Sequence, residues 1–477
     1  MESKILLKQD VGMKHYGKSD RIILLQLCTL LVLGLTYSLI IPPFEAPDEA
    51  AHFARAYGVA EGQFILHDHP ARLVQFIKEV LEEHHDAQSL PMLNLMNDLL
   101  EQQDSRIPNL AYNSSLYSPV PYLFHALVIK ILMTFGDSKL ILYTTFYLCR
   151  ILSVLLFVSL FYIATRALPV GAWPLFWTAV TPMALSQTGV VSTDFIVYGS
   201  AFVVICAGIG KLDDSRCLQG CFMASVFFLL MTKVTYIPLL IIPALFMMFV
   251  GGGARGPKVN AFWVGLISGL AGSITWNYLL TQFGIYETSL QIANRISTDH
   301  NIVLNPSAQF AFIVHFPLEF IKVIFRTLST NGGGLFHQFV GVLGWLDLPI
   351  LFFFIYLWTG GACASVLVAE RQGSPSERAS IIHGLICMSA AVLTFVAICA
   401  SAYIIWMPVG SLTINLQGRY FHPVVAAILV GAVLMRPFNL NPRFETRAGF
   451  GLLFASVLIN LVAVHSVFHR YGVWWSG

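Results

Sequence analysis

Residues 21–41 read RIILLQLCTLLVLGLTYSLII, and this run determines the class of the protein. About 20 apolar residues are enough to carry a helix across ~30 Å of hydrocarbon. The run is too long for the core of a signal peptide, and no small-x-small cleavage site accompanies it. Four lysines precede it: Lys4, Lys8, Lys14 and Lys18. We therefore expect a retained membrane anchor whose N-terminus is cytoplasmic.

The composition of the whole chain agrees with this first run. Of the 477 residues, 56% are hydrophobic and 11% are charged, and the mean hydropathy is +0.70. A soluble domain carries about 25% charged residues. The formal net charge of +2 gives no reason to expect a nucleic-acid partner. Six of the eight cysteines lie inside apolar runs, and Cys217 and Cys221 lack further ligands for zinc, so we expect no metal held by cysteine.

Further apolar runs, separated by Gly, Pro and charge, predict ten more membrane spans. They lie near residues 141–164, 172–190, 195–211, 218–232, 236–251, 260–281, 343–369, 380–406, 421–436 and 448–468. With the first run they make about eleven transmembrane helices, within a range of about 10 to 13. The sequence thus predicts an all-α polytopic membrane protein that forms a single transmembrane domain over residues 1–477.

Charge placement supports this count. Short cytoplasmic connections are expected to be rich in Lys and Arg. The connections predicted to be cytoplasmic contain Arg166, Lys211, Arg216, Arg255, Lys258, Arg371, Arg378, Arg436, Arg443 and Arg447. The short connections predicted to lie outside hold few positive charges, and the odd number of spans places the C-terminus outside.

Two longer segments fall on the predicted outer side. Residues 42–140 are expected to form a helical extracytoplasmic loop with juxtamembrane helices. Its middle (KEVLEEHHDAQ) is favoured as a solvated helix face over a metal cluster. Its last part (YSPVPYLFHALVIKILMTFG) is expected to be a helix that lies along the membrane surface or dips into it. If that last helix spans the membrane, the inside-outside order downstream is reversed. Residues 282–342 are expected to form a second loop with an interfacial helix, since Lys322 and Arg326 lie four apart.

Ionisable residues at or inside spans are costly, about 2.5–3.5 kcal/mol at a helix centre, and are therefore functional candidates. In this chain they share the predicted outer side. Asp48 and Glu49 follow the first span, Asp194 follows the third, Lys233 lies between the fifth and sixth, Asp347 begins the eighth, and Arg419 opens the tenth. We therefore expect one outward-facing polar site.

Asp48 and Glu49 lie in the stretch PPFEAPDEAAHFARAYGVAEGQ. Pro47 suits the first position of a new helix. Asp48, His52 and Arg55 would then share one face of that helix, and Glu49 would point elsewhere. A partly desolvated carboxylate here could accept a proton from a sugar hydroxyl. The alternative is an acidic helix start that the helix dipole favours.

The other candidates also have two interpretations. Lys233, in MTKVTYIPLL, suits a lipid phosphate or a lysine that reaches the membrane interface. Arg419, followed by Tyr420 in NLQGRYFHPVV, offers a guanidinium fork that matches phosphate. Asp194 and Asp347 could instead cap helices. The chain contains no G-x-x-x-x-G-K, G-x-G-x-x-G or G-x-S-x-G motif for soluble nucleotide or serine-hydrolase chemistry.

Five of these stretches together carry a family resemblance. PDEAAHFARAYGVAEGQ, TPMALSQTGVVSTD, TKVTYIPL, GVLGWLD and QGRYFHPV resemble a bacterial family of predicted membrane proteins, domain of unknown function 2142, over roughly residues 20–440. More distantly, the layout resembles the GT-C glycosyltransferases, which include protein mannosyltransferases and the aminoarabinose transferase of lipid A. The chain differs from the larger GT-C enzymes in lacking a soluble C-terminal domain, which leaves acceptor recognition to the two outer loops.

The resemblance implies an inverting glycosyltransferase of the bacterial inner membrane with its active site on the periplasmic or extracellular face. The implied partners are membrane lipids, a sugar on polyprenyl phosphate, and a lipid-linked or surface glycan acceptor such as the O-antigen of lipopolysaccharide. Asp48 and Glu49 match the acidic pair that provides the base, Asp194 matches a further acidic position, and Lys233 and Arg419 match basic positions suited to the phosphate. No cofactor is required, although a divalent cation could lie near the carboxylates.

Two other functions compete with this interpretation. One is a transporter or flippase of lipid-linked sugars, and the other is a non-catalytic protein of envelope assembly. Transporters usually place their polar groups near the bilayer midplane and contain internal repeats. This sequence gathers its polar groups at one predicted face and shows no repeat.

Overall fold

The computed structural model describes most of the chain. The described residues are 2–65, 68–84, 106–108, 114–168, 170–210, 212, 215–249, 256–296, 304–370, 377–438 and 442–472. The acidic, His-rich middle of the first predicted loop continues into residues 85–105, which lie outside them. The fold is 82% helical, which agrees with the prediction of an all-α membrane protein.

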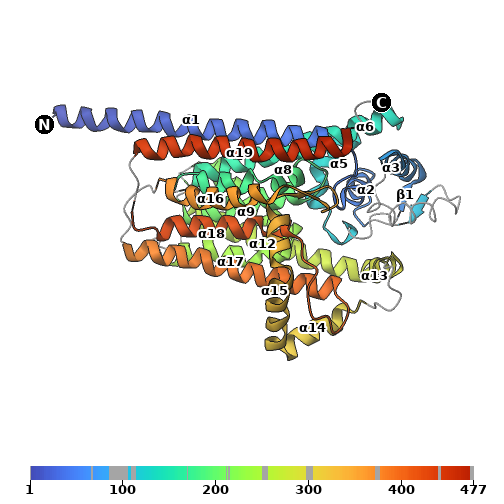
Figure 1. Cartoon of the computed structure of the whole chain (residues 1–477). Coiled ribbons are helices and arrows are strands. Elements are labelled where there is room, and N and C mark those ends of the chain that lie inside the picture. The colour runs from blue at the N-terminus through green and yellow to red at the C-terminus, as the bar shows by residue number, and fades with distance from the viewer. Residues whose placement is uncertain are drawn as a thin grey trace.

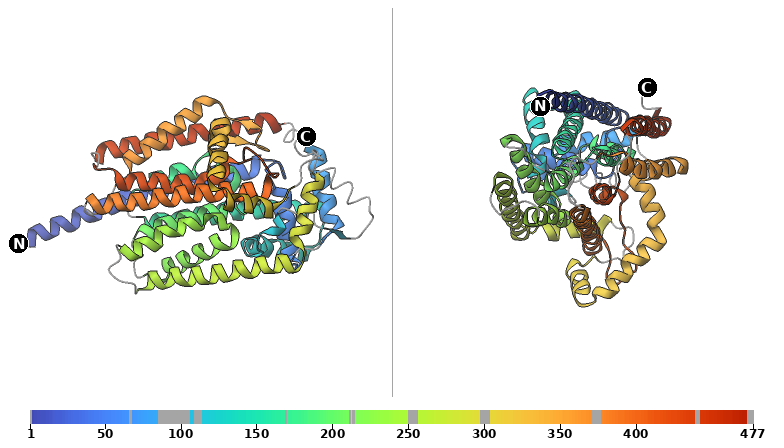
Figure 2. Two further views of the ribbon diagram at one scale, coloured as in Figure 1. Left: turned by 90° about the horizontal axis from the view of Figure 1, so that it is seen from below. Right: turned by 90° about the vertical axis from the view of Figure 1, so that its left-hand side faces the viewer.

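Long helices run side by side and form the body of the molecule (Figures 1 and 2). They are α1 (Glu2–Ile40), α6 (Lys139–Ala167), α12 (Pro257–Gln282), α17 (Glu377–Trp406) and α19 (Pro442–Tyr471), and the shorter α18 (His422–Met435) lies among them. Within the described residues, six segments are long and apolar enough to cross a membrane. They are Asp20–Ile40, Lys139–Ala167, Pro257–Gln282, Ser380–Trp406, Gly418–Met435 and Thr446–Tyr471.

The predicted count of about eleven spans is therefore not reached, because five of the predicted spans are short helices. They are α7 (Trp173–Ala179) with α8 (Pro182–Thr188), α9 (Asp194–Ile209), α10 (Arg216–Thr232), η5 (Val234–Leu240) with α11 (Ile241–Phe249), and α16 (Phe352–Val368). Even 17 residues rise only about 26 Å as a helix, less than the ~30 Å of hydrocarbon. Hydropathy alone does not distinguish a helix buried in protein from one facing lipid.

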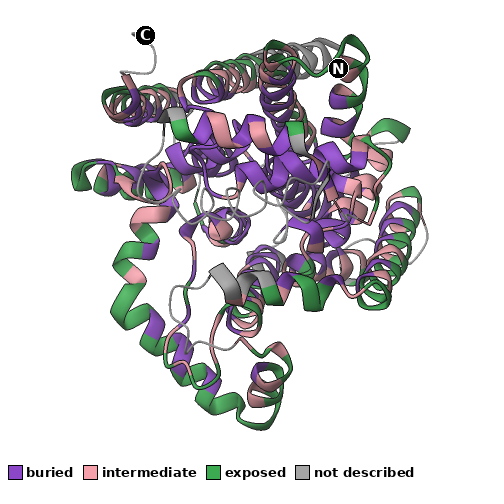
Figure 3. Cartoon of the chain, turned by 90° about the vertical axis from the view of Figure 1, so that its right-hand side faces the viewer, coloured by how far each residue is buried: buried purple, intermediate pink, exposed green. Residues whose placement is uncertain are grey.

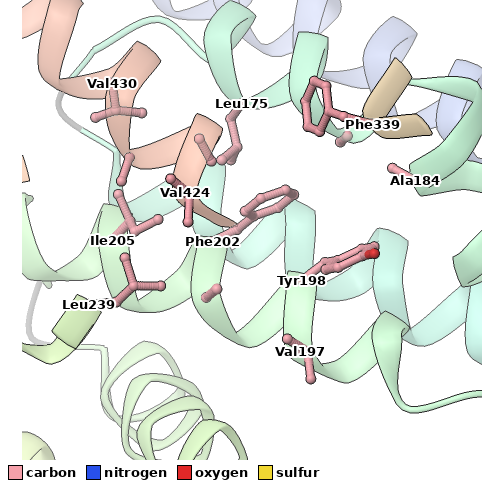
Figure 4. Close-up of a cluster of buried hydrophobic side chains, with 14 of the residues drawn as sticks. Leu175, Ala184, Val197, Tyr198, Phe202, Ile205, Leu239, Phe339, Val424 and Val430 are labelled. Carbon is pink, nitrogen blue, oxygen red and sulfur yellow. The ribbon is translucent and has the colours of Figure 1, made fainter. Parts of the chain in front are cut away.

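Helix α9 shows why the hydropathy pattern was ambiguous. It lies inside the molecule between α6 and α10, and nearly all of its residues are buried. Phe202 and Ile205 project from it towards Val424 of α18 (Figure 4). Viewed from the end, buried residues fill the centre of the molecule and exposed residues follow its rim (Figure 3). The apolar composition of α9 thus reflects burial by neighbouring helices.

One end of the bundle carries a second, smaller hydrophobic core. It is built from α2 (Glu49–Ala60), α3 (Ala71–His84), α5 (Leu123–Leu132) and the start of α6, with β1 (Asp68–Pro70) paired antiparallel to β2 (Arg106–Pro108) (Figure 1). Short 3-10 turns precede and follow α5: η2 (Ser114–Leu116), η3 (Val120–Tyr122) and η4 (Met133–Phe135). Aromatic rings around Phe44 fill this core, with the Phe146 ring centroid 4.8 Å away. The described part of the first predicted loop is therefore folded and mainly helical.

The second predicted loop contains α13 (Ile285–Ile296), α14 (Pro306–His315) and α15 (Pro317–Gly341). Helices α14 and α15 are long and apolar enough to cross a membrane only when taken together, and they meet at a bend of 107°. Lys322 and Arg326 are exposed on α15. A hairpin of β3 (Val342–Leu343) and β4 (Leu348–Pro349) follows. The interfacial position of this segment stays a prediction.

The middle of α15 is unusual. None of residues 328–334 is buried, and this stretch contains three consecutive glycines, Gly332, Gly333 and Gly334. A Cβ placed on any of the three would meet no atom within 4 Å. In contrast, Leu335 and Phe339 beyond the glycines are buried again. We call residues 328–334 the bare neck of α15.

Basic side chains gather at the end of the bundle opposite α2 and bind the carbonyl groups of helix ends. Lys258 Nζ donates to the carbonyls of Gly208 and Gly210, at 2.9 and 2.7 Å. Arg436 similarly donates to the carbonyl of Ala369, just after α16, at 2.8 Å. Two of the ten basic residues predicted to be cytoplasmic, Lys258 and Arg436, thus lie at this end of the fold, and Lys211, Arg255 and Arg371 lie outside the described residues. That this end faces the cytoplasm stays a prediction.

Candidate functional site

Four of the predicted site residues meet in one chain of ionic contacts near the end of the bundle that carries α2. Asp48 precedes α2, Asp194 begins α9, Lys233 follows α10, and Arg419 lies in η6 (Gly418–Phe421). Arg419 lies 2.7 Å from Asp48 Oδ2 and 4.0 Å from Asp194 Oδ2. Lys233 Nζ lies 2.8 Å from Asp194 Oδ1. We call these four residues the ionic chain.

Asp48 has an unusual backbone conformation. Its φ of 64° and ψ of 3° place it in the left-handed region, which aspartate tolerates better than most residues. Because of this turn, α2 begins at Glu49, two residues later than predicted from Pro47. The Asp48 side chain makes no capping hydrogen bond to α2 and extends to Arg419 instead. It is 36% exposed, the largest value in the ionic chain.

Glu49 points to the opposite side and is sealed inside the protein. Its two oxygens accept from Arg150 Nε and Nη2 at 2.8 and 2.6 Å, and both side chains are fully buried. The backbone amides of Phe44 and Val191 donate to the same carboxylate at 3.1 and 2.8 Å. Arg150 also donates to the carbonyl of Pro42 at 3.0 Å. The Glu49–Arg150 pair thus fixes the chain segment between α1 and α2.

Arg150 was not among the predicted site residues, although the sequence contained a signal for it. It lies within the predicted span at residues 141–164. A charged residue inside a span is rare and calls for a partner. The partner could not be named from the sequence, since Glu49 lies 101 residues away.

Lys233 and Asp194 form the inner end of the ionic chain. Their side chains are 13% and 4% exposed. The rings of Tyr420 and Tyr117 flank the ammonium group, with centroids 5.0 and 6.0 Å from Nζ. Thr193 is the N-cap residue of α9, so the Asp194 side chain is free to bind Lys233. Tyr117 was missed by the sequence analysis because nothing in its local pattern sets it apart.

Arg419 is held by more groups than the carboxylate of Asp48. Its Nε donates to Gln417 Oε1 at 2.7 Å, and Nη1 donates to Gln187 Oε1 at 2.8 Å. Nη1 also lies 3.5 Å from the carbonyl oxygen of Pro47. The Arg419 side chain is only 4% exposed. Gln187 and Gln417 lie in two of the quoted family stretches, but the sequence analysis did not select either.

His52 and Arg55 both contact Tyr122, with the Arg55 guanidinium carbon 5.9 Å from its ring centroid, whereas Asp48 turns to Arg419 instead of completing the predicted shared face. His52 Nδ1 lies 2.6 Å from the Tyr122 hydroxyl, and burial lowers the pKa of His52 to about 4, so the ring is neutral near pH 7. The charges of Asp48 and Asp194 oppose that lowering, which places His52 beside the ionic chain. Arg55 donates to the carbonyls of Gln63, Phe64 and Tyr117 and thereby anchors the loop after α2.

A comparison with protein families identifies the chain. The family model described as predicted membrane protein (DUF2142) matches residues 31–428, which is most of the sequence. The chain belongs to this family. The matched range includes the whole ionic chain and the Glu49–Arg150 pair. No curated protein and no solved structure matches the chain.

In this DUF2142 protein, Asp347 belongs to a second ionic cluster. It lies in the turn between β3 and β4, before α16, and its Oδ2 accepts from Arg470 of α19 at 2.6 Å. Glu45 lies in the same cluster, with Tyr471 donating to its Oε2 at 3.5 Å. Burial raises the pKa of Glu45 to about 7, and the positive charge of Arg470 opposes this rise. The sequence placed Asp347 on the correct end of the bundle but could not give this partner.

The carboxylates of the family member are engaged by basic side chains. Asp48 pairs with Arg419, and Asp194 pairs with Lys233. Across the part of the chain that the structure describes, no group of three or more His, Cys, Asp or Glu side chains is arranged to hold a metal ion. The ionic chain thus brings together the accessible carboxylate of Asp48, the buried carboxylate of Asp194 and two cations, with the neutral His52 beside them.

Proposed function

We propose that this protein is a GT-C type glycosyltransferase that moves a sugar from a polyprenyl-phosphate donor to an extracytoplasmic acceptor glycan, such as O-antigen or another envelope polysaccharide. The observation that carries the proposal is one accessible carboxylate beside two buried cations. Asp48 is 36% exposed, whereas Arg419 and Lys233 are 4% and 13% exposed. A base and a binding site for an anionic leaving group thus lie next to each other.

The contacts favour Asp48 over Glu49 as the base. Glu49 is fully buried and accepts hydrogen bonds from Arg150 and from two backbone amides, so no acceptor hydroxyl can approach it. Asp48 uses Oδ2 to bind Arg419, which leaves Oδ1 for an acceptor hydroxyl. A general base must lie within hydrogen-bond reach of the proton it removes.

The proposed reaction is a single displacement. The acceptor oxygen attacks the anomeric carbon as its proton moves to Asp48, and the bond between that carbon and the phosphate oxygen breaks. The electron pair leaves with polyprenyl phosphate, and the configuration at the anomeric carbon is inverted. Fixed cations in a site shielded from water stabilise the developing negative charge more strongly than water does.

The two ends of the bundle support the proposed orientation. Basic side chains such as Lys258 and Arg436 lie at the end opposite the ionic chain, as expected for the cytoplasmic side of a bacterial inner-membrane protein. The ionic chain would then open to the periplasmic side, where polyprenyl-linked sugars are used. Its residues lie at the ends of helices, which favours an enzyme over a transporter with a site at the bilayer midplane.

The experiment is a transfer assay on the purified full-length chain in detergent or nanodiscs. Polyprenyl-phosphate hexoses carrying a labelled sugar are supplied with candidate acceptor glycans, and labelled product is measured. Asp48→Asn should lower the rate by a factor of about 100 to 10,000, the usual contribution of a general base. Asp137→Asn, at an exposed aspartate in the loop before α6, is the matched control and should keep the wild-type rate. Wild-type transfer by the Asp48→Asn protein would contradict the proposal.

A further inference from the structure

We infer that the two cations of the ionic chain have different tasks: Lys233 contacts the donor phosphate, and Arg419, fixed by Gln187 and Gln417, is a positioning residue that holds Asp48. This division of tasks rests on the proposed function, because it assigns roles within the same site. It replaces the expectation from sequence that both cations bind the phosphate alike. The two cations differ in how many of their N–H donors are already used.

The donors of Arg419 are almost fully used. A guanidinium has five N–H donors in a fixed plane. Among the described residues, Gln417, Gln187, Pro47 and Asp48 accept from four of them. A fork that binds a phosphate with two parallel hydrogen bonds needs two adjacent free donors. Arg419 therefore cannot offer that fork unless one of its present contacts breaks.

The same contacts make Arg419 a clamp on the base. Its guanidinium binds the carboxylate of Asp48 and also approaches the carbonyl of Pro47. It therefore holds both the Asp48 side chain and the backbone just before Asp48. Asp48 occupies the left-handed region with φ 64°. For a residue with a Cβ, this conformation costs on the order of 1 kcal/mol and persists only when its surroundings enforce it. The contacts with Arg419 hold Asp48 in this conformation. Gln187 and Gln417 in turn fix the orientation of the guanidinium group.

Lys233 has the opposite properties. An ammonium group has three donors, and among the described residues Lys233 Nζ gives one of them to Asp194 at 2.8 Å. Its side chain is 13% exposed, compared with 4% for Arg419. A lysine binds phosphate as a point charge and needs no fixed fork. Its remaining donors and its greater exposure therefore favour Lys233 as the group that meets the phosphate.

The first test separates binding from turnover. The probe is farnesyl phosphate, whose affinity for the purified full-length chain is measured by calorimetry. Lys233→Met should weaken this affinity by about tenfold or more, the loss expected for a charge-assisted hydrogen bond. Arg419→Lys should change the affinity by less than about threefold and lower kcat of sugar transfer by about 100-fold, because it disturbs the base and not the phosphate contact.

The second test asks whether Gln187 acts through Arg419. Gln187→Leu should lower kcat about tenfold alone and add nothing further to Arg419→Lys, since residues that act as one unit are non-additive. The matched control is Gln309→Leu. Gln309 is also buried and donates to the carbonyls of Met407 and Pro408, but it lies in α14 and should leave both affinity and kcat at wild-type values.

The outcomes distinguish this inference from the proposed function. Equal loss of farnesyl phosphate affinity in Lys233→Met and Arg419→Lys would overturn the division of tasks, as would additive losses of kcat in the Gln187→Leu, Arg419→Lys double variant. If the wild-type chain transfers no sugar but binds farnesyl phosphate through Lys233 alone, the proposed function fails and the assignment of the phosphate to Lys233 stands. If the wild-type chain binds the probe no better than Lys233→Met does, that assignment is wrong.

Discussion

Asp48 and Glu49 are adjacent in the chain and each pairs with an arginine, yet the two pairs differ in nearly every physical property. The Glu49–Arg150 pair is fully buried, whereas Asp48 is 36% exposed beside a buried Arg419. The left-handed residue Asp48 separates them, because it ends the turns that follow α1 and sends the next side chain inward. Two carboxylates one residue apart can therefore have different roles: Glu49 stabilises the fold, and Asp48 is available for chemistry.

The energetics of the two pairs differ for the same reason. Taking two charges out of water is costly, and the attraction between them offsets that cost only when further hydrogen bonds satisfy both groups. Glu49 accepts such bonds from two backbone amides, and Arg150 donates such bonds to backbone carbonyls. A solvent-exposed pair contributes about 0–1 kcal/mol to stability. The Asp48–Arg419 pair is open to solvent on its Asp48 side, so we expect it to contribute less than the fully buried pair. We therefore expect stability to depend on Arg150 and activity to depend on Asp48.

The largest expected effect on stability comes from breaking the buried pair. Arg150→Met leaves the Glu49 carboxylate buried and uncompensated, which should lower the free energy of unfolding by about 3–5 kcal/mol. The measurement is denaturant or thermal unfolding of the protein in detergent. The double variant Glu49→Met, Arg150→Met should recover part of the loss because it removes both charges. If Arg150→Met is as stable as the wild type, the Glu49–Arg150 pair does not stabilise the fold.

A third carboxylate, Glu45, gives a smaller effect that depends on pH. It is buried, and Tyr471 donates to one of its oxygens. Burial raises its pKa from 4.5 to about 7 in the folded state, so the folded protein binds a proton that the unfolded chain releases. Stability from this group is fully present below about pH 4.5 and is lost as the pH rises to about 7.

Glu45→Gln should remove this dependence. We expect the wild type to lose about 1–3 kcal/mol of stability relative to the variant between about pH 5 and 7.5. Thermal unfolding of both proteins across this range measures the difference. His52, whose pKa is lowered, acts with the opposite sign but is present in both proteins and cancels. Parallel curves for the two proteins would show that Glu45 does not hold the proton.

The smallest expected effect completes the comparison. Asp48→Asn should change the free energy of unfolding by less than about 1 kcal/mol, because the side chain is partly exposed and asparagine tolerates the left-handed region. The same unfolding measurement used for Arg150→Met tests it. If Asp48→Asn destabilises the protein as much as Arg150→Met does, both pairs are structural and the assignment of Asp48 as a base loses its support.

The sequence predicted the residues of the ionic chain because a general rule applies to them. Charged residues at the ends of apolar runs are expensive, and their positions could be assigned to one side by counting runs. The rule could not separate Asp48 from Glu49, since that distinction depends on a positive φ at Asp48 and on Arg150, 101 residues from its partner. The rule also could not show that Asp347 lies apart from the ionic chain. It assigns residues to one side of the membrane but does not say which of them are neighbours on that side.

The fold was predicted less completely than the class. Residues 21–41 and the other long runs correspond to long helices, but runs such as residues 195–211 belong to helices covered by protein. Hydrophobic composition indicates that a helix is removed from water. It does not indicate whether the helix is surrounded by lipid or by other parts of the protein. A count of apolar runs can therefore exceed the number of helices that are long and apolar enough to cross a membrane, which is six or at most seven among the described residues.

The bare neck of α15 has a mechanical consequence. On one side of it, Gln309 of α14 binds the carbonyls of Met407 and Pro408, and on the other side Gln338 accepts from the amide of Gly418, next to Arg419. Within the neck no side chain is buried, and each glycine weakens a helix by about 1 kcal/mol relative to alanine. Across the neck, α15 is held by its backbone hydrogen bonds and by the local side-chain bonds of Ser329 and Thr330. The neck is therefore a compliant link within α15, whereas Gln309 and Thr327 join α14 and the first half of α15 directly to the loop that leads to Arg419.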